Sequence, residues 1–164
     1  MDIPNREPIN YFLEPGCLYL ATQPALISTV LGSCVSICLW DRRKRIGGMN
    51  HFVLPSFQSH QEANTRFGNV ATPLLIKMMQ EEGSVLADLE AQLFGGARTV
   101  RNISANIGRE NVAMARKILS HFGIPIISED VEGQLGRKIV FNTLSGEVVV
   151  LKVKQLRRSD WSHR

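Results

Sequence analysis

The stretch 31–55 constrains the fold of this chain more than any other part of its sequence. It predicts two extended segments, at 35–40 and 45–54, that are joined by a polar turn at 41–44. Successive strand residues point to opposite faces, and the first segment is apolar on both, with Val35, Ile37 and Leu39 on one side and Cys38 and Trp40 on the other. A strand of this kind has to be buried between two layers, so we expect a layered domain built around it.

The same hairpin brings a thiol toward an imidazole. If 41–44 form the turn, Trp40 pairs with Arg45, and Cys34 then lies directly opposite His51. The Cβ atoms of opposed residues in an antiparallel pair are about 4.5–5.5 Å apart. A cysteine that close to a histidine can form a thiolate–imidazolium pair, which is an activated nucleophile. A bulge at 47–48 would instead shift the register by one and separate the two side chains.

An alternative interpretation makes Cys34 a small buried hydrophobe and His51 a core histidine, since free cysteine is among the most buried residue types. Glycines beside both residues favour a functional site. Gly32 lets the backbone approach a substrate closely, and Gly47-Gly48 suits the close approach of another chain.

The rest of the chain predicts more strands than helices. Apolar residues at helical spacing predict helices near 69–82 and 110–122, each followed by a glycine. Strands are expected at 17–22, 26–30, 89–94, 124–128, 138–142 and 147–153. Hairpins outnumber strand–helix–strand crossovers, which favours the α+β class. A length of 164 residues predicts one domain.

Composition excludes several classes of protein. No apolar run approaches the length of a transmembrane helix, and the N-terminus lacks the apolar core of a secretory signal. Three cysteines are an odd number and too few for a disulfide scaffold, which favours a reducing, cytoplasmic compartment.

The net charge of +4 comes entirely from the C-terminal end. Residues 151–164 hold five basic side chains and one acidic one, whereas basic and acidic residues balance before them. Such a tail can contact acidic receptors, lipid headgroups or nucleic acid, but a solvated terminus is the simpler expectation. The sequence contains no nucleic-acid-binding motif, so we expect no nucleic-acid partner.

Two blocks of sequence, Leu-Gly-Ser-Cys-Val-Ser-Ile-Cys-Leu-Trp-Asp at 31–41 and Gly-Gly-Met-Asn-His-Phe-Val-Leu-Pro at 47–55, resemble the CheD family, the chemoreceptor glutamine deamidases of bacterial chemotaxis. The resemblance extends to 93–97, 106–112 and 136–139, and covers about residues 15–153. It implies a three-layer α/β/β sandwich of the CheD type. A single domain would then span 1–164, with a basic tail at about 154–164.

The resemblance also implies roles for residues. Cys34 would be the nucleophile and His51 its general base in the hydrolysis of a glutamine side-chain amide. Deamidases of this family carry a third, hydroxyl-bearing residue upstream of the cysteine. Ser28 and Thr29 both fit that position, and residue identity favours Thr29.

The oxyanion of such a reaction needs hydrogen-bond donors that are already in place. The backbone N–H groups of Cys34 and of its neighbours Gly32 and Ser33 are the candidates.

Other polar residues of the hairpin do not fit a catalytic role. Asn50 is next to His51 and should point to the opposite face. Asp41 lies about 20 Å along the strand from Cys34 and is expected to open the turn. A metal site is not expected, because Cys34 and Cys38 are about 13 Å apart along a regular strand.

The remaining cysteines and histidines are assigned structural positions. Cys17 and Cys38 are interpreted as core residues, and His60, His121 and His163 as surface or loop residues. The glycines at 95–96 are expected at a bend, because a phosphate loop would need a lysine at a defined spacing. Glu132 stands where the family usually has a glycine, which puts the local loop in question.

The resemblance implies an enzyme that converts glutamine to glutamate, with release of ammonia, on the cytoplasmic helices of chemoreceptors. It also implies a CheC-type phosphatase as a partner, and no cofactor is expected. The alternative is a non-catalytic module that docks on receptors or on the phosphatase. A thiol protease or a transglutaminase-like enzyme would share the chemistry but not the two sequence blocks.

Overall fold

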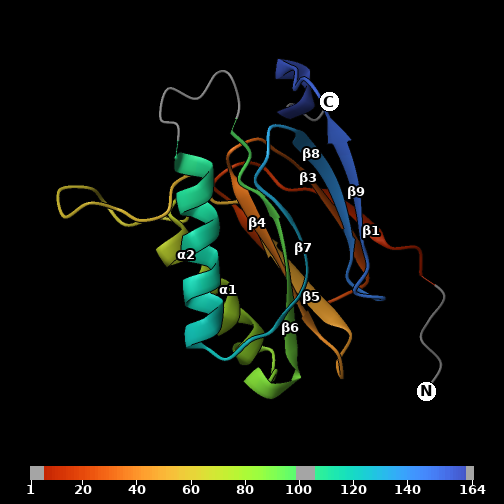
Figure 1. The fold of residues 1–164 in the computed structure, drawn as a ribbon. Helices are drawn as coiled ribbons and strands as arrows, with labels where there is room; N and C mark the ends of the chain where they lie inside the picture. The colour runs from red at the N-terminus through yellow and green to blue at the C-terminus, as the bar shows by residue number, and fades with distance from the viewer. Residues whose placement is uncertain (1–5, 99–105, 162–164) are drawn as a thin grey trace.

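Three layers make up the computed structural model, which describes residues 6–98 and 106–161. Two helices lie on one face of a five-stranded sheet, and a four-stranded sheet lies on the other face (Figure 1). The predicted α+β class and the three-layer α/β/β arrangement are therefore confirmed.

The middle layer is the five-stranded sheet, with strand order β2-β5-β4-β6-β7. All its pairs are antiparallel except β6–β7. Its strands are β2 (Leu18–Ala21), β4 (Val35–Asp41), β5 (Ile46–Asn50), β6 (Leu89–Gly95) and β7 (Ile126–Val131). Strand β4 is buried on both faces, as its sequence predicts: Ile37 packs toward the helices and Cys38 toward the second sheet.

The four-stranded sheet has the order β1-β3-β8-β9. Its strands are β1 (Ile9–Phe12), β3 (Ala25–Leu31), β8 (Gly136–Asn142) and β9 (Val148–Val153). Ile27, Leu31 and Phe141 of this sheet pack against Met49 and Phe94 of the middle layer. The core between the sheets ends beside the β3–β4 connection, where Cys34 lies.

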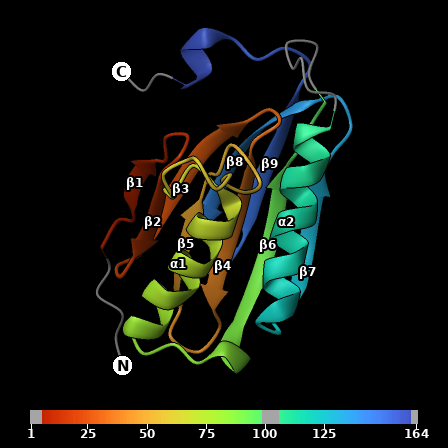
Figure 2. The same ribbon diagram turned by 90° about the vertical axis from the view of Figure 1, so that its left-hand side faces the viewer.

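Helices α1 (Gly68–Glu81) and α2 (Ile107–His121) cover the other face of the five-stranded sheet (Figure 2), and a short 3-10 helix, η1 (Leu86–Asp88), precedes β6. Both helices begin earlier than predicted. The first residue of α1, Gly68, lies against Phe52, and a Cβ at this position would stand 2.8 Å from the Phe52 ring. A glycine is therefore needed where the helix starts. Neither helix among the described residues combines the length and the apolar character that a membrane crossing needs.

The loop between β4 and β5 lies one residue later than 41–44. The carboxylate of Asp41 accepts the N–H groups of Arg43 and Lys44, each at 2.9 Å, and the backbone of Asp41 pairs with Ile46. Asp41 is therefore the last residue of β4, and its side chain organises the loop, which confirms the expected turn role.

This loop shifts the hairpin register by two residues from the predicted one. Trp40 pairs with Gly47, not with Arg45, and the predicted direct opposition of Cys34 and His51 is wrong. Only a shift of one residue exchanges the faces of a strand, so a shift of two leaves Cys34 and His51 on the same face.

The C-terminal end packs against the four-stranded sheet through a 3-10 helix, η2 (Arg158–Trp161). The indole N–H of Trp161 donates to the carbonyl of Val30 at 3.1 Å, and Lys138 pairs with Asp160 at 2.9 Å. The terminus is therefore packed, and not frayed, as far as Trp161, because an indole ring and an ion pair anchor the chain there. Its described basic side chains are exposed to solvent, as expected: Lys152, Lys154, Arg157 and Arg158.

Candidate active site

Cys34 and His51 lie at the same end of the neighbouring strands β4 and β5. Cys34 immediately precedes β4, His51 immediately follows β5, and their neighbours Val35 and Phe52 exchange two backbone hydrogen bonds of 3.1 and 3.0 Å. Continuing this register puts Ser36 opposite His51, so that Cys34 is the diagonal neighbour of the histidine. Diagonal neighbours on one face are within reach of a long or aromatic side chain.

The ring of His51 is fixed by Thr29. The Thr29 hydroxyl donates its proton to the carbonyl of Leu13 at 2.7 Å, and it lies 2.7 Å from Nδ1 of His51. A hydroxyl has one proton, so Thr29 can only accept from Nδ1. Nδ1 of His51 therefore carries the proton, and a neutral imidazole then has its lone pair on Nε2.

Thr29, and not Ser28, faces the histidine. Thr29 is buried in β3, and Ser28 points to the opposite face of that strand because successive side chains alternate. The contribution of Ser28 is a backbone one, since its carbonyl accepts the N–H of Leu13 at 2.8 Å. This hydrogen bond holds the Leu13 carbonyl beside Thr29.

Burial keeps His51 neutral. The side chain is fully buried, and the loss of hydration lowers the pKa of His51 to about 4. Among the described residues, nothing forms a hydrogen bond with its Nε2. This nitrogen is therefore an unprotonated acceptor at neutral pH.

Cys34 is a protonated thiol in this structure. Burial raises the pKa of Cys34 to about 11, against the opposing influence of the Arg66 guanidinium and of the backbone N–H of Cys34 itself. The residue nevertheless keeps partial exposure, so a substrate can reach it. Because Nε2 of His51 has no partner, the thiol and the imidazole are not hydrogen bonded, and the pair is neutral at rest.

Glycines behind the cysteine allow a close approach of β6. Gly95 has φ +107°, and a Cβ on it would stand 2.1 Å from the carbonyl oxygen of Cys34. The next residue, Gly96, donates its N–H to that oxygen at 2.9 Å. The glycine pair therefore has a packing role at the end of β6. There it supports residues 32–34 between β3 and β4, which we call the cysteine loop.

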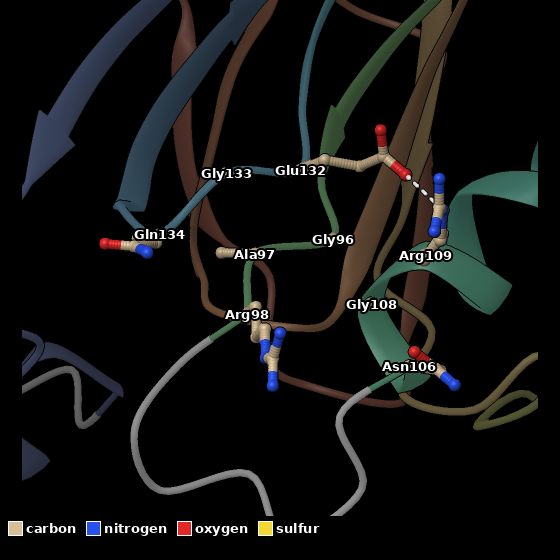
Figure 3. Close-up of a pocket in the computed structure, with 9 residues that line it drawn as sticks. All are labelled: Gly96, Ala97, Arg98, Asn106, Gly108, Arg109, Glu132, Gly133 and Gln134. Atoms are coloured by element: carbon tan, nitrogen blue, oxygen red, sulfur yellow. Dashed lines mark ion pairs between the residues drawn. The ribbon is translucent and has the colours of Figure 1, made fainter.

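A cavity of about 320 Å³ lies beside this loop, between the ends of β6 and β7 and the start of α2 (Figure 3). Arg98, Asn106 and Arg109 line it, together with Glu132, which pairs with Arg109 at 3.7 Å. Glu132 has φ +65°, which glycine adopts without strain. The fold thus accommodates Glu132 in a left-handed conformation, the conformation expected of the glycine that the family resemblance implies at this position.

The other candidate residues take the following positions. Asn50 points toward the helices, where its side chain accepts from Ile37 N and donates to Thr72, so its exclusion as a partner of His51 is confirmed. The prediction of a core position is right for Cys38 and wrong for Cys17, which is exposed just before an edge strand. His60 and His121 are exposed as expected, and His163 lies outside the described residues.

Within the parts of the chain that the structure describes, no group of three or more His, Cys, Asp or Glu side chains is arranged to hold a metal ion. The site itself presents a thiol and a neutral imidazole base on one face. This is the residue set of a cysteine-dependent acyl-transfer reaction.

Sequence reasoning missed three contributors to the site: the carbonyl of Leu13, the cation of Arg66 and the amide of Asn111. Of these three, only the role of Asn111 could have been recognised from the sequence. It interrupts the buried stripe of α2 formed by Gly108, Val112, Ala115 and Leu119, and a buried amide needs hydrogen-bond partners.

Comparisons with known proteins find similar sequences and one similar solved structure. A family model described as "CheD chemotactic sensory transduction" matches residues 53–152. The "Probable chemoreceptor glutamine deamidase CheD" of Trichlorobacter lovleyi is 39% identical over 147 residues, 88% of this chain and 91% of that protein. The "Probable chemoreceptor glutamine deamidase CheD 1" of Anaeromyxobacter dehalogenans is 42% identical over 137 residues, 82% of this chain and 80% of that one. Among solved structures, Bacillus licheniformis YfiH has a TM-score of 0.44 at 16% identity, over 71% of this chain and 49% of that chain.

Proposed function

This chain belongs to the CheD family, and from that premise we propose that it is a hydrolase that converts glutamine side chains of chemoreceptors to glutamate and releases ammonia. The observation that carries the proposal is the Nε2 atom of His51. It is buried, unprotonated and without a partner among the described residues, on the face that also carries Cys34. A reaction that must take a proton from a thiol needs such an acceptor.

The first half of the proposed reaction forms a thioester. Nε2 of His51 takes the thiol proton while the sulfur of Cys34 attacks the carboxamide carbon of the glutamine, and the amide oxygen becomes an oxyanion. The oxyanion collapses, the C–N bond breaks, and the imidazolium gives its proton to the leaving nitrogen. Ammonia departs, and the acyl group stays on sulfur.

The second half restores the enzyme. Water enters where ammonia left, and Nε2 of His51 removes a proton from it as the oxygen attacks the thioester carbon. The C–S bond breaks, the sulfur takes the proton back from the imidazolium, and glutamate is released. Thr29 keeps Nδ1 protonated throughout, so the same nitrogen serves both halves.

The neutral resting pair indicates when the nucleophile forms. A thiol with a pKa of about 11 does not transfer its proton to an imidazole with a pKa of about 4 in the free enzyme. Proton transfer is therefore coupled to the attack on a bound glutamine, where the oxyanion receives hydrogen bonds. The backbone N–H groups of Ser33 and Cys34 are the proposed donors, on a loop that Gly32 begins.

The proposed substrate indicates where the enzyme acts and which proteins it binds. Chemoreceptors present their modified glutamines on cytoplasmic helices, so the enzyme acts in the cytoplasm as one domain that spans the chain. A CheC-type phosphatase is the proposed regulatory partner. Co-purification of the two proteins tests that part separately.

Intact-mass spectrometry of a chemoreceptor cytoplasmic fragment tests the reaction. Incubation with the enzyme is expected to give the small mass gain of replacing –NH2 with –OH at each modified glutamine. The Cys34→Ala variant should give no gain. Cys17→Ala should match the wild type, because it changes an exposed thiol and keeps the backbone carbonyl that accepts the N–H of His51 at 3.0 Å.

The possible outcomes separate the alternatives. Receptor fragments of lower mass would indicate a protease, and a stable complex without any mass gain would indicate a docking module. Activity retained in Cys34→Ala would contradict the assignment of the nucleophile.

A further inference from the structure

One buried side chain of α2 joins the two segments that carry the candidate nucleophile and base. The amide Nδ2 of Asn111 donates to the carbonyl of Ser33 at 3.0 Å and to the carbonyl of Val53 at 2.9 Å. Ser33 precedes Cys34, and Val53 lies two residues beyond His51. Asn111 is fully buried, so these two hydrogen bonds form away from competing water and are costly to lose.

The position of Asn111 depends on a glycine contact at the start of α2. A Cβ on Gly108 would stand 2.4 Å from the carbonyl oxygen of Gly96, and a Cβ on Gly96 would stand 2.4 Å from the side chain of Val112. Figure 3 shows Gly96 and Gly108 next to each other, at the end of β6 and the beginning of α2. Only glycines let the helix approach this closely, and this approach brings Asn111 within reach of the cysteine loop.

Asn111 completes a row of three anchors on consecutive carbonyls. Ala97 N–H donates to the carbonyl of Gly32 at 3.0 Å and Gly96 N–H to that of Cys34 at 2.9 Å, while Asn111 holds the carbonyl of Ser33 between them. Asn111 is the one side chain in this row; the other two donors are backbone groups.

The row of anchors decides where the N–H groups of the loop point. In a trans peptide the C=O of one residue and the N–H of the next point in opposite directions, and the described residues contain no cis peptide. With the carbonyls of Gly32 and Ser33 held toward β6 and α2, the N–H groups of Ser33 and Cys34 point away from these elements. No backbone acceptor among the described residues takes up either N–H.

We propose that Asn111 is a positioning residue that orients the Ser33 and Cys34 N–H groups as the oxyanion-binding donors. Its two hydrogen bonds also clamp the cysteine loop to residues 51–53, the segment that carries His51. The inference rests on the proposed deamidation for its role in catalysis. It assigns to Asn111 no contact with the substrate. Its effect should therefore appear in turnover and not in substrate binding.

The test compares Asn111→Asp with Leu119→Ala in the full chain. Asn111→Asp keeps the size of the side chain but removes both donated hydrogen bonds. Leu119→Ala destabilises the same helix near its other end, where Leu119 is buried in the core. Steady-state deamidation of a receptor fragment is measured for each variant and normalised to the folded fraction from circular dichroism.

In Asn111→Asp, kcat should fall by about 10²–10³-fold, the range found when an oxyanion donor is lost, with KM within threefold of wild type. Leu119→Ala should lower the melting temperature and keep kcat within threefold. A kcat within threefold of wild type in Asn111→Asp would overturn the proposal. So would an equal loss of kcat in both variants, because that is the pattern of general destabilisation.

Iodoacetamide alkylation of Cys34, followed by mass spectrometry of its peptide, tests this clamp, the pair of hydrogen bonds from Asn111 to Ser33 and Val53, without any receptor. Asn111→Asp should change the alkylation rate at least threefold relative to both wild type and Leu119→Ala, and equal rates would overturn the clamp. If the wild type deamidates nothing but this difference is present, the clamp stands and the proposed function fails.

Discussion

The hydroxyl of Thr29 decides which nitrogen of His51 is free to accept a proton. Thr29→Val removes the acceptor for Nδ1–H and leaves the Leu13 carbonyl without its donor. We expect kcat for deamidation to fall by about 10- to 100-fold, because the imidazole then loses its fixed tautomer. Thr29→Ser, which retains the hydroxyl, should recover most of the activity.

Ser28→Ala is the matched control for this change, since the Ser28 side chain points to the other face of β3 and only its carbonyl is used. Its kcat should equal that of the wild type. Steady-state kinetics on a receptor fragment checks all three variants. Wild-type turnover in Thr29→Val would show that the hydroxyl does not orient the base.

Arg66 is the cation that acts on the Cys34 thiol. It lowers the pKa of Cys34 against the dominant effect of burial, so Arg66→Gln should raise that pKa further above its usual value. Alkylation of Cys34 by iodoacetamide at pH 9 should therefore be slower in Arg66→Gln than in the wild type. The Arg43→Gln variant, with an exposed side chain in the β4–β5 loop, serves as the control.

The salt dependence separates charge from packing in this experiment. Arg66 is exposed, so its influence is screened, and about 1 M salt reduces the Debye length to about 3 Å. The difference in alkylation rate should then shrink. A difference that salt leaves unchanged would mean that Arg66 acts through the loop it belongs to and not through its charge.

The packing of β6 against the cysteine loop depends on Gly95, the last residue of β6. Gly95→Ala would place a Cβ 2.1 Å from the Cys34 carbonyl at φ +107°, so we expect a loss of about 2–4 kcal/mol of unfolding free energy. Gly123→Ala is the matched control: it has φ +68° and nothing within 4 Å of its Cβ. That change should cost only about 1 kcal/mol.

Urea denaturation of both variants measures the difference, and deamidation by the folded protein shows whether the cysteine loop has moved. Equal stabilities would mean that the backbone at Gly95 relaxes without disturbing Cys34. The comparison isolates the steric contact from the cost of a positive φ.

The sequence predicts these elements where their apolar residues form a clear pattern. Strand β4 is found correctly because it is apolar on both faces. Strand β1 is missed because Ile9–Tyr11 are exposed and give no buried alternation. The register of β4 and β5 is missed because the loop is set by the carboxylate of Asp41 and by Arg45 at φ +52°, and not by a glycine or asparagine.

The site itself is predictable only in part. The residue types and the strand periodicity bring Cys34 and His51 to one face, even with the register wrong by two. The preference for Thr29 over Ser28 agrees with the strand geometry. The hydrogen bond from Asn111 to Ser33 joins residues 78 positions apart, and no local pattern encodes such a contact.

The stability of the whole molecule should depend on pH through His51. Burial lowers the pKa of His51 from 6.5 to about 4, so between these values the unfolded chain binds a proton that the folded protein does not. The folded state should therefore lose stability as pH falls from 6.5 to 4, by at most about 1.4 kcal/mol per pH unit from this group.

Urea denaturation at pH 7.5, 6.0 and 5.0 checks this slope. His51→Gln should flatten it, and His121→Gln, which changes an exposed histidine, should leave it unchanged. Asp41 and Asp130 have lowered pKa values, so the stabilisation that their carboxylates provide is lost only at still lower pH. A slope that persists in His51→Gln would assign the effect to another group.

The proposed active site joins two sheets, because Thr29 belongs to β3 and its hydrogen-bond partner His51 follows β5. Strand β3 pairs on one side with the short β1 and on the other with β8, residues Gly136–Asn142. A growing chain on the ribosome carries Cys34 and His51 long before it has synthesised β8. We therefore expect nascent chains to be inert toward receptors, with activity beginning only after β8 has been synthesised and has paired with β3.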